Sequence, residues 1–320
     1  MPRTPPRLRL PKAVLLASAV AFASMPASAA EKVSLILDWF VNPDHGPIIV
    51  ADELGYFEEA GVDLTIESPA DPNDPPKLVA AGRYDLAVTY QPQLHLQVDR
   101  GLPLVRIGTL VATPLNTILV LKEGPIRSIA DLKGRKVGFS VGGFEETVLG
   151  VALEKHGLSV EDITLINVNW ALSQSLIAGQ VDAVVGGYRN FELNQMAIEG
   201  HEGHAFYVEE EGMPPYDELV IVSNKEKLDR EVYRSFLTAI ERGVQFLVNH
   251  PEEAWEAFIR SHGDLDDELN RRAWADTLPR FALRPAALDV ARYERFAEFL
   301  KGREMIAEVP PVESYAVQLR

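Results

Sequence analysis

The stretch VSLILDWFVNPDHGP, residues 33–47, decides the fold prediction because it joins a strand pattern to the start of a helix. Its first six residues form a short apolar run that is β-branched at Val33 and Ile36, as in a buried parallel strand. Pro47 suits the first turn of a helix, and apolar side chains then recur at roughly helical spacing up to residue 60. A strand followed directly by a helix is the unit from which α/β folds are built.

This alternation continues along the chain and then starts again. In the first unit, further strands are expected at residues 62–67, 85–89 and 104–111, with helices at 77–81 and 93–100. In the second unit, the expected strands are 136–140, 163–168, 181–185 and 205–208, with helices at 144–156, 173–178 and 190–199. Two successive α/β units of similar size predict two lobes. Later helical patterns at 228–248, from 250 onward and at 286–300 are expected to cover the first lobe.

The pattern predicts a lobe 1 made of residues 31–112 and 222–320, C-terminal helices included, and a lobe 2 made of residues 116–217. The crossovers near residues 112–116 and 217–222 are expected to form a hinge, with a cleft between the lobes. Ligands of open α/β sheets bind beyond the carboxyl ends of the strands. Site residues are therefore expected just after positions 38, 89, 140 and 185.

The first 30 residues have the pattern of a signal peptide that is cleaved on export. Four basic residues precede an apolar run at 13–23, and Ala27-Ser28-Ala29 forms a small-residue cleavage motif before Ala30 or Glu31. The apolar run is much shorter than the roughly 20 residues that span a bilayer. The sequence therefore predicts an exported, soluble product, and an uncleaved anchor is the alternative.

Composition argues against several classes of function. Removing the four basic residues of the leader changes the net charge from −16 to −20, and this acidity disfavours binding to nucleic acid or anionic lipid. The sequence has no cysteine, which excludes disulfides, thiolate nucleophiles and cysteine-based zinc or iron–sulfur sites. The motifs H-E-x-x-H and G-x-S-x-G are absent. His201 and His204 lie in a glycine-flanked loop, where a solvated turn is favoured over a metal site.

The loop after the first strand offers a carboxylate, an indole, an amide and an imidazole, from Asp38, Trp39, Asn42 and His45. An aromatic wall with a few directional polar groups suits a flat, nitrogen-rich heterocycle. The alternative is that Trp39 and Phe40 belong to the core and that Asp38 caps the next helix. Tyr90 ends another strand and Asn116 lies in a crossover, so each is either a ligand contact or an ordinary strand-end or turn residue.

In the second unit, Gly142, Gly143 and Phe144 join a strand to a helix start, where backbone N–H groups can approach a ligand. The motif is neither a phosphate-binding loop nor a dinucleotide fingerprint, and the acidic side chains of Glu145 and Glu146 argue against phosphate.

The segment after residue 185 contains Tyr188, Asn190 and Glu192. Tyr188 and Glu192 are four residues apart and can share one face of a helix start. A carboxylate at Glu192 can accept hydrogen bonds from the amine and ring N–H of an aminopyrimidine. The alternative is that Glu192 only stabilises the helix dipole.

The combination of these motifs resembles the NMT1/THI5-like family of periplasmic solute-binding proteins. The matching segments occur in family order at residues 37–45, 55–62, 90–93, 114–117, 131–138 and 187–192, within a similarity that spans about residues 33 to 225. Within the family, the sequence is most similar to ThiY-type receptors, which deliver formylaminopyrimidine or hydroxymethylpyrimidine precursors of thiamine to an ABC importer.

The resemblance implies a type II periplasmic-binding-protein fold, in which two α/β lobes joined by a two-crossover hinge close on a ligand. It also implies a periplasmic location and an inner-membrane ABC permease as partner. Trp39 and Tyr188 would contact the pyrimidine ring, and Glu192 would accept from its amino group. Further polar contacts would come from Asn42, His45, Tyr90 and Asn116.

Two alternatives to this ligand and activity remain at this stage. Residues 142–144 depart from the loop of the thiamine-precursor branch, so riboflavin, nitrate or sulfonate receptors of the same fold stay open. Pyrimidine synthases of the same superfamily use a cysteine-rich, iron-linked segment and a reactive histidine with pyridoxal phosphate. Because this chain has no cysteine, a binding protein with no cofactor and no metal is the expected function.

Overall fold

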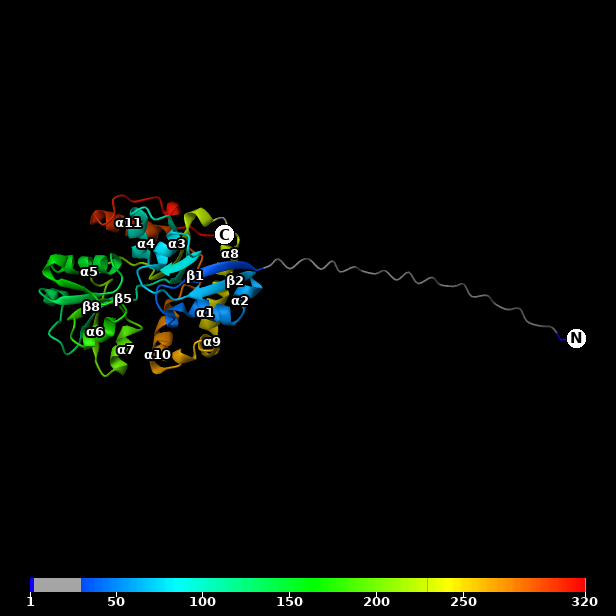
Figure 1. Cartoon of the computed structure of the whole chain (residues 1–320), viewed down its shortest axis with the longest axis horizontal. Coiled ribbons are helices and arrows are strands. Elements are labelled where there is room, and N and C mark those ends of the chain that lie inside the picture. The colour runs from blue at the N-terminus through cyan, green and yellow to red at the C-terminus, as the bar shows by residue number, and fades with distance from the viewer. Residues whose placement is uncertain (3–29, 229, 320) are drawn as a thin grey trace.

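The computed structural model describes residues 1–2, 30–228 and 230–319, and Figure 1 shows their arrangement. The predicted leader, residues 1–30, lies almost entirely outside the described residues. The described residues form two five-stranded sheets with helices packed on their faces, and each sheet with its helices is called a lobe below.

The first sheet has the strand order β2-β1-β3-β10-β4. Its strands are β1 (Glu31–Ile36), β2 (Val62–Glu67), β3 (Leu86–Thr89), β4 (Leu104–Val111) and β10 (Leu219–Asn224). The strand β1 pairs in parallel with β2 and β3, whereas β10 is antiparallel to both β3 and β4. All residues of β3, β4 and β10 are buried, which agrees with the continuous apolar runs of these segments.

The second sheet repeats this plan with the order β7-β6-β8-β5-β9. Its strands are β5 (Asn116–Leu121), β6 (Lys136–Phe139), β7 (Thr164–Asn167), β8 (Ala183–Tyr188) and β9 (Gly203–Tyr207). The strand β6 pairs in parallel with β7 and β8, and β5 is antiparallel to β8 and β9. In each sheet the fourth strand, β10 or β5, is the one that arrives directly from the other lobe.

Helices α1 to α7 alternate with the strands along the chain. They are α1 (Gly46–Glu53), α2 (Tyr56–Glu59), α3 (Pro75–Ala80), α4 (Gln91–Asp99), α5 (Phe144–Lys155), α6 (Leu172–Ile177) and α7 (Glu192–Ile198). The C-terminal helices are α8 (Val232–Asn249), α9 (Pro251–Phe258), α10 (Glu268–Thr277) and α11 (Val290–Gly302). Figure 1 shows α5 on one side of the second sheet and α6 and α7 on the other.

The structure differs from the sequence prediction in three local features. The helix expected over residues 48–60 is divided into α1 and α2, because Gly55 adopts a left-handed φ of 73° between them. The strand β5 follows directly after the first crossover, where no strand was expected. Residues 219–222, expected as part of a crossover, belong to the buried strand β10, and the chain passes back between the sheets in residues 208–218.

The helix that follows the Asp38 loop is held against α8 by unusually close packing. Gly243 of α8 faces α1, and a Cβ atom at this position would lie 2.5 Å from the carbonyl oxygen of Pro47 and 2.9 Å from the Cβ of Ala51. Only glycine allows the two helices to approach this closely. The packing fixes α1, and therefore the loop that precedes it, against the body of the first lobe.

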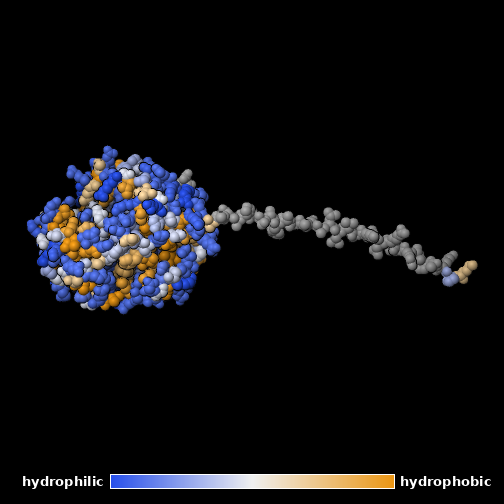
Figure 2. All heavy atoms as spheres, viewed as in Figure 1, coloured by the Kyte–Doolittle hydropathy of each residue, from blue (hydrophilic) through white to orange (hydrophobic). Residues whose placement is uncertain are grey.

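Polar and charged residues cover most of the face that Figure 2 shows, and apolar residues form separate groups between them. Among the described residues, no helix combines the length and the apolar character that crossing a membrane requires.

Candidate ligand-binding cleft

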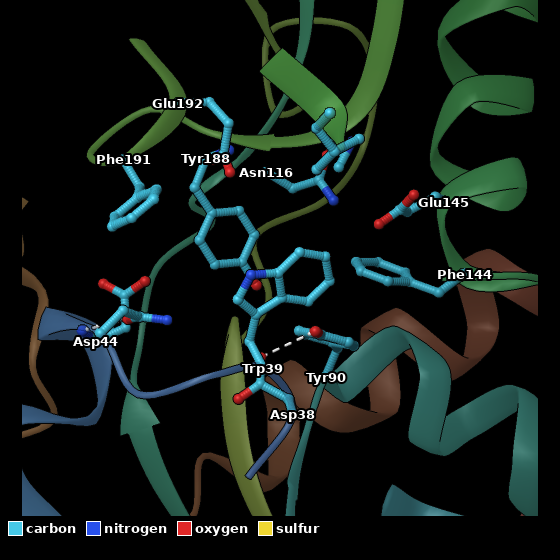
Figure 3. Close-up of a pocket in the computed structure, with 13 residues that line it drawn as sticks. Asp38, Trp39, Asp44, Tyr90, Asn116, Phe144, Glu145, Tyr188, Phe191 and Glu192 are labelled. Carbon is cyan, nitrogen blue, oxygen red and sulfur yellow. Dashed lines mark hydrogen bonds between the residues drawn. The ribbon is translucent and has the colours of Figure 1, made fainter. Parts of the chain in front are cut away.

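A cavity lies where strand ends and loops of the two lobes face each other (Figure 3). Its walls bound about 460 Å³, a figure that includes the part open to solvent. The side chains that line it approach one another closely, so the cavity is a narrow slot. It is lined by Asp38, Trp39, Asn42, Asp44, Tyr90, Asn116, Phe144, Glu145, Leu172, Gly186, Tyr188, Phe191 and Glu192.

Aromatic rings supply most of the apolar wall. The rings of Tyr90 and Phe144, from different lobes, stack with centroids 5.1 Å apart at an angle of 20°. The indole of Trp39 projects into the middle of the cavity in Figure 3, near the ring of Tyr188. Trp39 also contacts Trp170 of the second lobe in an edge-on arrangement, with ring centroids 4.3 Å apart. Flat walls at such short separation favour a planar ligand.

The carboxylate of Asp38 organises the first-lobe wall. One of its oxygens lies 2.9 Å from His45 Nε2, and the other accepts a hydrogen bond of 2.9 Å from the Tyr90 hydroxyl. The loop itself is fixed by Asn42, whose side chain accepts from the backbone N–H of Asp44 at 2.8 Å. Burial and the adjacent Asp38 charge raise the pKa of Tyr90 well above its usual value, so the hydroxyl remains a donor. His45 therefore supports the wall from behind and does not line the cavity.

Asp44 joins the two lobes at one end of the slot. Its Oδ1 accepts hydrogen bonds from Asn190 Nδ2 at 2.6 Å and from the Thr277 hydroxyl at 3.0 Å. Asn190 comes from the second lobe, whereas Thr277 ends α10. Burial raises the pKa of Asp44 to about 6, although His45 and these two donors oppose the shift. Asn190 thus acts across the cleft through Asp44, outside the lining.

Glu192 begins α7 and turns back towards the end of β8. Its Oε2 accepts a hydrogen bond of 2.6 Å from the backbone N–H of Tyr188. Burial raises the pKa of Glu192 to about 7, and the Asp44 charge raises it further, whereas the backbone donors oppose the shift. A hydrogen-bond donor from a ligand would therefore stabilise the ionised form of this buried carboxyl group.

Glu145 lies on the other side of the slot, in the first turn of α5. Its Oε2 accepts a hydrogen bond of 2.6 Å from the backbone N–H of Ser140. Its Oε1 occupies the space that a side chain on Gly186 would need, since a Cβ there would lie 2.3 Å away. Burial raises the pKa of Glu145 to about 8, and the charges of Glu192 and Glu218 also raise it. The Glu145 carboxyl is therefore mostly protonated at neutral pH.

Asn116 presents an unsatisfied donor to the same space. Its Oδ1 accepts from the backbone N–H of Gly186 at 3.2 Å, which fixes the orientation of the amide. Its Nδ2 is buried and has no partner among the described residues. Figure 3 shows the amide turned towards the part of the cavity that Glu145 also faces. A buried N–H without a partner is costly, so this position favours a ligand acceptor.

Glu218 connects the cavity wall to both chain crossovers. Its Oε2 accepts the backbone N–H groups of Leu115 at 2.6 Å and Asn116 at 3.0 Å, and its Oε1 accepts from the Tyr188 hydroxyl at 3.3 Å. Burial raises the pKa of Glu218 to about 7, although the backbone N–H groups of Asn116 and Leu115 and the Tyr216 hydroxyl oppose the shift. The residue lies just behind the lining and was absent from the sequence prediction.

The lining contains four carboxyl groups and no lysine or arginine. Such a cavity repels anions, and several carboxyl groups close together cannot all be ionised in a buried site. Hydrogen-bond acceptors are abundant and donors are few. The arrangement therefore selects an uncharged or cationic ligand that is rich in donors. No cluster of three or more His, Cys, Asp or Glu residues suitable for a metal ion occurs in the described part of the chain.

Eight of the eleven residues proposed from the sequence line this one cavity: Asp38, Trp39, Asn42, Tyr90, Asn116, Phe144, Tyr188 and Glu192. His45 and Asn190 lie behind Asp38 and Asp44, as described above. Gly143 lies outside the lining, with a φ of 85° and the Arg100 guanidinium about 3.7 Å from the position of a Cβ.

Sequence reasoning missed five lining residues, namely Asp44, Glu145, Leu172, Gly186 and Phe191. Asp44 and Phe191 are immediate neighbours of proposed residues, and the strand-end rule could have included them. Glu145 was interpreted only as evidence against phosphate, although its place in the first turn of a helix at a strand end was visible.

Comparison with known proteins places the chain in a family. The family model described as NMT1/THI5 like matches residues 42–254. A Haemophilus influenzae protein, provisionally named a thiamine biosynthesis protein, is 50% identical over 297 residues, 92% of this chain and 95% of its own. The formylaminopyrimidine-binding protein of Halalkalibacterium halodurans is 35% identical over 252 residues, 78% of this chain and 76% of its own.

A more distant relative carries the name of an enzyme. The 4-amino-5-hydroxymethyl-2-methylpyrimidine phosphate synthase of Legionella pneumophila is 26% identical over 254 residues, 78% of this chain and 80% of its own. The family therefore includes proteins named for binding and proteins named for synthesis.

Among solved structures, the alkanesulfonate-binding protein SsuA of Xanthomonas axonopodis matches with a TM-score of 0.71 at 16% identity. The match covers 91% of this chain and 99% of that one. The predicted periplasmic-binding-protein fold, with two α/β lobes, is thereby confirmed. On the family match and the 50% identical relative, this chain belongs to the NMT1/THI5-like family.

Proposed function

We propose that this chain is the substrate-binding component of an ABC importer, which captures a thiamine pyrimidine precursor of the formylaminopyrimidine or hydroxymethylpyrimidine type. The observation that carries this proposal is the slot lined by five aromatic rings and four carboxyl groups, without a basic side chain. An aminopyrimidine is planar and presents N–H donors, which are the two properties that this lining selects. The name of the 35% identical relative supports the same ligand class.

The acidic lining of the cavity favours an aminopyrimidine over the anions that other receptors of this fold bind. A sulfonate or nitrate would enter a space with four carboxyl groups and no cation, and its charge would lack a partner. The similarity to the alkanesulfonate receptor therefore supports the fold and not that ligand. Riboflavin is the second candidate, since it is also flat, but the narrow slot favours a single small ring.

In this proposal, Trp39 and Tyr188 cover the faces of the ring and Glu192 accepts from the exocyclic amine. Tyr90 closes the slot by stacking on Phe144 across the cleft. A hydrogen bond to a charged acceptor contributes about 1.5–3 kcal/mol. Glu192 therefore has the larger effect on which ligand is selected, and the aromatic rings supply most of the contact area.

In this proposal the first lobe closes on the second around the two chain crossovers, residues 112–115 and 208–218. Contacts across the cleft already exist, such as Asp44 with Asn190. A ligand shifts the balance between open and closed forms only by binding the closed form more tightly. The exported chain works in the periplasm and delivers its ligand to an inner-membrane permease.

The test compares Glu192→Gln with Glu199→Gln, an exposed glutamate at the end of the same helix. Titration calorimetry with 4-amino-5-hydroxymethyl-2-methylpyrimidine and formylaminopyrimidine should show micromolar or tighter binding by the wild type. Glu192→Gln should weaken it about tenfold or more, and Glu199→Gln should leave it unchanged. Equal affinities of the two variants would contradict the role of Glu192. Tighter binding of riboflavin or an alkanesulfonate than of either pyrimidine would contradict the proposed ligand.

The synthase alternative is tested on the same preparation. Catalysis of pyrimidine synthesis in the related enzymes requires pyridoxal phosphate, which is an anion, and this slot offers it no cationic side chain. Absorbance near 400 nm and mass spectrometry of the native protein should find no pyridoxal phosphate. Stoichiometric cofactor would favour an enzyme over a receptor.

A further inference from the structure

The side of the slot that faces α5 has a hydrogen-bonding pattern of its own. Glu145 and Asn116 flank Gly186: Asn116 accepts from the Gly186 N–H, and the Glu145 carboxyl fills the space beside the Gly186 Cα. Figure 3 shows both side chains turned into the same part of the cavity, beyond the indole of Trp39. Neither residue is more than 4% exposed, so a ligand here would exchange hydrogen bonds with them rather than with water.

The two groups offer more than acceptors. Asn116 Nδ2 is a buried donor without a partner in the described chain. A protonated carboxyl group supplies one O–H donor and one carbonyl acceptor side by side, whereas an ionised carboxylate only accepts. An aminopyrimidine has the complementary edge, at which an amine N–H adjoins a ring nitrogen that accepts. The ring nitrogen and the facing carboxyl oxygen form a hydrogen bond only when one of the two atoms carries a proton and the other does not.

We propose that Glu145 and the ring nitrogen next to the amine of the ligand share a single proton, and that Asn116 donates to a second acceptor of the same ligand. This inference rests on the proposed function and deepens it, because it names the edge by which the pyrimidine is recognised. When the proton stays on Glu145, the O–H donates to the ring nitrogen. When it moves to the ring, a carboxylate faces a protonated edge, and the number of protons in the complex is the same.

The titration of Glu145 can be distinguished experimentally from that of the groups around it. The titratable groups that act on it are Glu192 of α7, Glu218 beside β10 and Tyr90, which precedes α4. Tyr188 of β8 and Asp38 and Asp44 of the first-lobe loop line the same cavity, and Arg100 lies beside Gly143. Burial holds the pKa of Glu145 near 8 and the pKa values of Glu192 and Glu218 near 7. Burial also raises the pKa values of Tyr90 and Tyr188 well above 10. Because the pKa of Glu145 is raised above those of Glu192 and Glu218 and lies below those of the two tyrosines, we expect its proton to determine binding on the alkaline side.

The experiment measures the affinity for 4-amino-5-hydroxymethyl-2-methylpyrimidine by calorimetry between pH 7.5 and 9.5, in buffers of different ionisation enthalpy. The wild type should lose affinity by about tenfold per pH unit above pH 8, and binding should take up nearly one proton at pH 9.5. Glu145→Gln carries a donor and an acceptor at every pH, so it should bind with an affinity that is flat over this range. Glu145→Ala should bind more weakly at all pH values, and Glu154→Gln, exposed on the same helix, should follow the wild type.

A second arm does not depend on the folding of any variant. An analogue in which C–H replaces the ring nitrogen next to the amine should bind the wild type at least tenfold more weakly and show no fall above pH 8. Wild-type affinity that is flat or rises from pH 8 to 9.5 would overturn the shared proton, as would equal binding of the analogue. In those cases pyrimidine binding itself, and hence the proposed function, would stand. Failure of every pyrimidine to bind the wild type would instead refute the proposed function and this inference with it.

Discussion

At the scale of single residues, the proposed ligand would require opposite protonation states of two acids in the cavity. Under the proposal, Glu192 is ionised and accepts from the amine, whereas Glu145 retains a proton at the complementary edge. Their different surroundings provide the difference: Glu145 is influenced by the charges of both Glu192 and Glu218, and its pKa is the higher of the two, about 8 against about 7. Pairs of acids with separated pKa values are a common way to give two carboxyl groups different roles.

This arrangement predicts how affinity changes on the acid side. Because the free protein holds the pKa of Glu192 near 7, lowering the pH from 7.5 to 5.5 protonates the acceptor and should weaken pyrimidine binding at least tenfold. The measurement is calorimetry or quenching of tryptophan fluorescence, since Trp39 lies in the cavity. In Glu192→Gln the affinity should no longer fall between pH 7.5 and 5.5, whereas in Glu199→Gln it should fall as in the wild type. Constant wild-type affinity from pH 5.5 to 7.5 would contradict an ionised acceptor at position 192.

The sequence predicted the residues of this site unequally, and the reason is physical. Trp39 and Tyr90 lie shortly after strands and Tyr188 ends β8, so the strand-end rule and the resemblance located them. Glu145 also follows a strand, but its significance depends on burial beside Gly186 and on the charges of residues far away in the chain. Local patterns contain no information about such shifts. The hinge contact of Glu218 was missed for the same reason, since its partners Leu115 and Asn116 are about a hundred residues away.

At the scale of elements, apolar periodicity predicted most strands and helices but not every boundary. The apolar runs at residues 33–38 and 104–111 contain the strands β1, which ends at Ile36, and β4, whose residues are all buried, as the continuous apolar pattern of a two-sided sheet predicts. Residues 219–222, expected in a crossover, instead form part of the buried strand β10. Periodicity alone joined α1 to α2, because Gly55 interrupts the helix through its backbone while the apolar spacing continues. The strand β5 was missed because a short apolar run after a crossover has no periodic pattern to distinguish it.

The packing of α1 against α8 gives a test of how elements support the site. Gly243→Ala places a methyl group 2.5 Å from the Pro47 carbonyl oxygen, so the two helices must separate. Overpacking of this kind typically costs about 1–3 kcal/mol. Because α1 follows the loop of Asp38 and His45, the shift should also weaken ligand binding. Thermal and urea unfolding with calorimetry measure both effects.

The matched control is Gly150→Ala in α5, where the nearest atom to a new Cβ lies 3.9 Å away. Alanine is favoured over glycine by about 1 kcal/mol inside a helix, so this variant should be as stable as the wild type or more stable. Similar stabilities of the two variants would show that the α1–α8 contact tolerates a methyl group.

At the scale of the whole molecule, several ionisable side chains are buried in the cleft, and their desolvation lowers the free energy of unfolding, which the packing of the rest of the fold must offset. The buried acids Glu145, Glu192 and Glu218 have pKa values of about 7 to 8, far above the usual value for glutamate, chiefly because of burial. The ligand-free protein keeps these groups partly protonated and loses stability when they ionise. If the cavity binds ligand as proposed, its buried acids lower the stability of the empty protein, which is a common cost of function.

The consequence is a stability that falls with rising pH in the absence of ligand. A group whose pKa is raised by folding stabilises the folded state below its unfolded pKa, and this contribution is lost as the pH rises through the folded pKa. For Glu192, Glu218 and Glu145, that loss continues from pH 7 to 9. Acids with lowered pKa, such as Glu209 beside Arg189, have given their full contribution well below pH 7. Buried His95, whose pKa falls to about 3 because of burial, adds almost no further stability above pH 7.

A chain of residues 31–320 should therefore show a melting temperature that drops by several degrees between pH 7 and 9 without ligand. The fall should be smaller in Glu145→Gln, because the amide has no proton to lose, and unchanged in Glu154→Gln. Scanning calorimetry at constant ionic strength gives the measurement, since the net charge of residues 31–320 also makes the stability depend on salt. A melting temperature that is constant or rises over this range would mean that the cleft acids are solvated in the free protein. The slot would then be open to water, and closure on the ligand, rather than folding, would bury these groups.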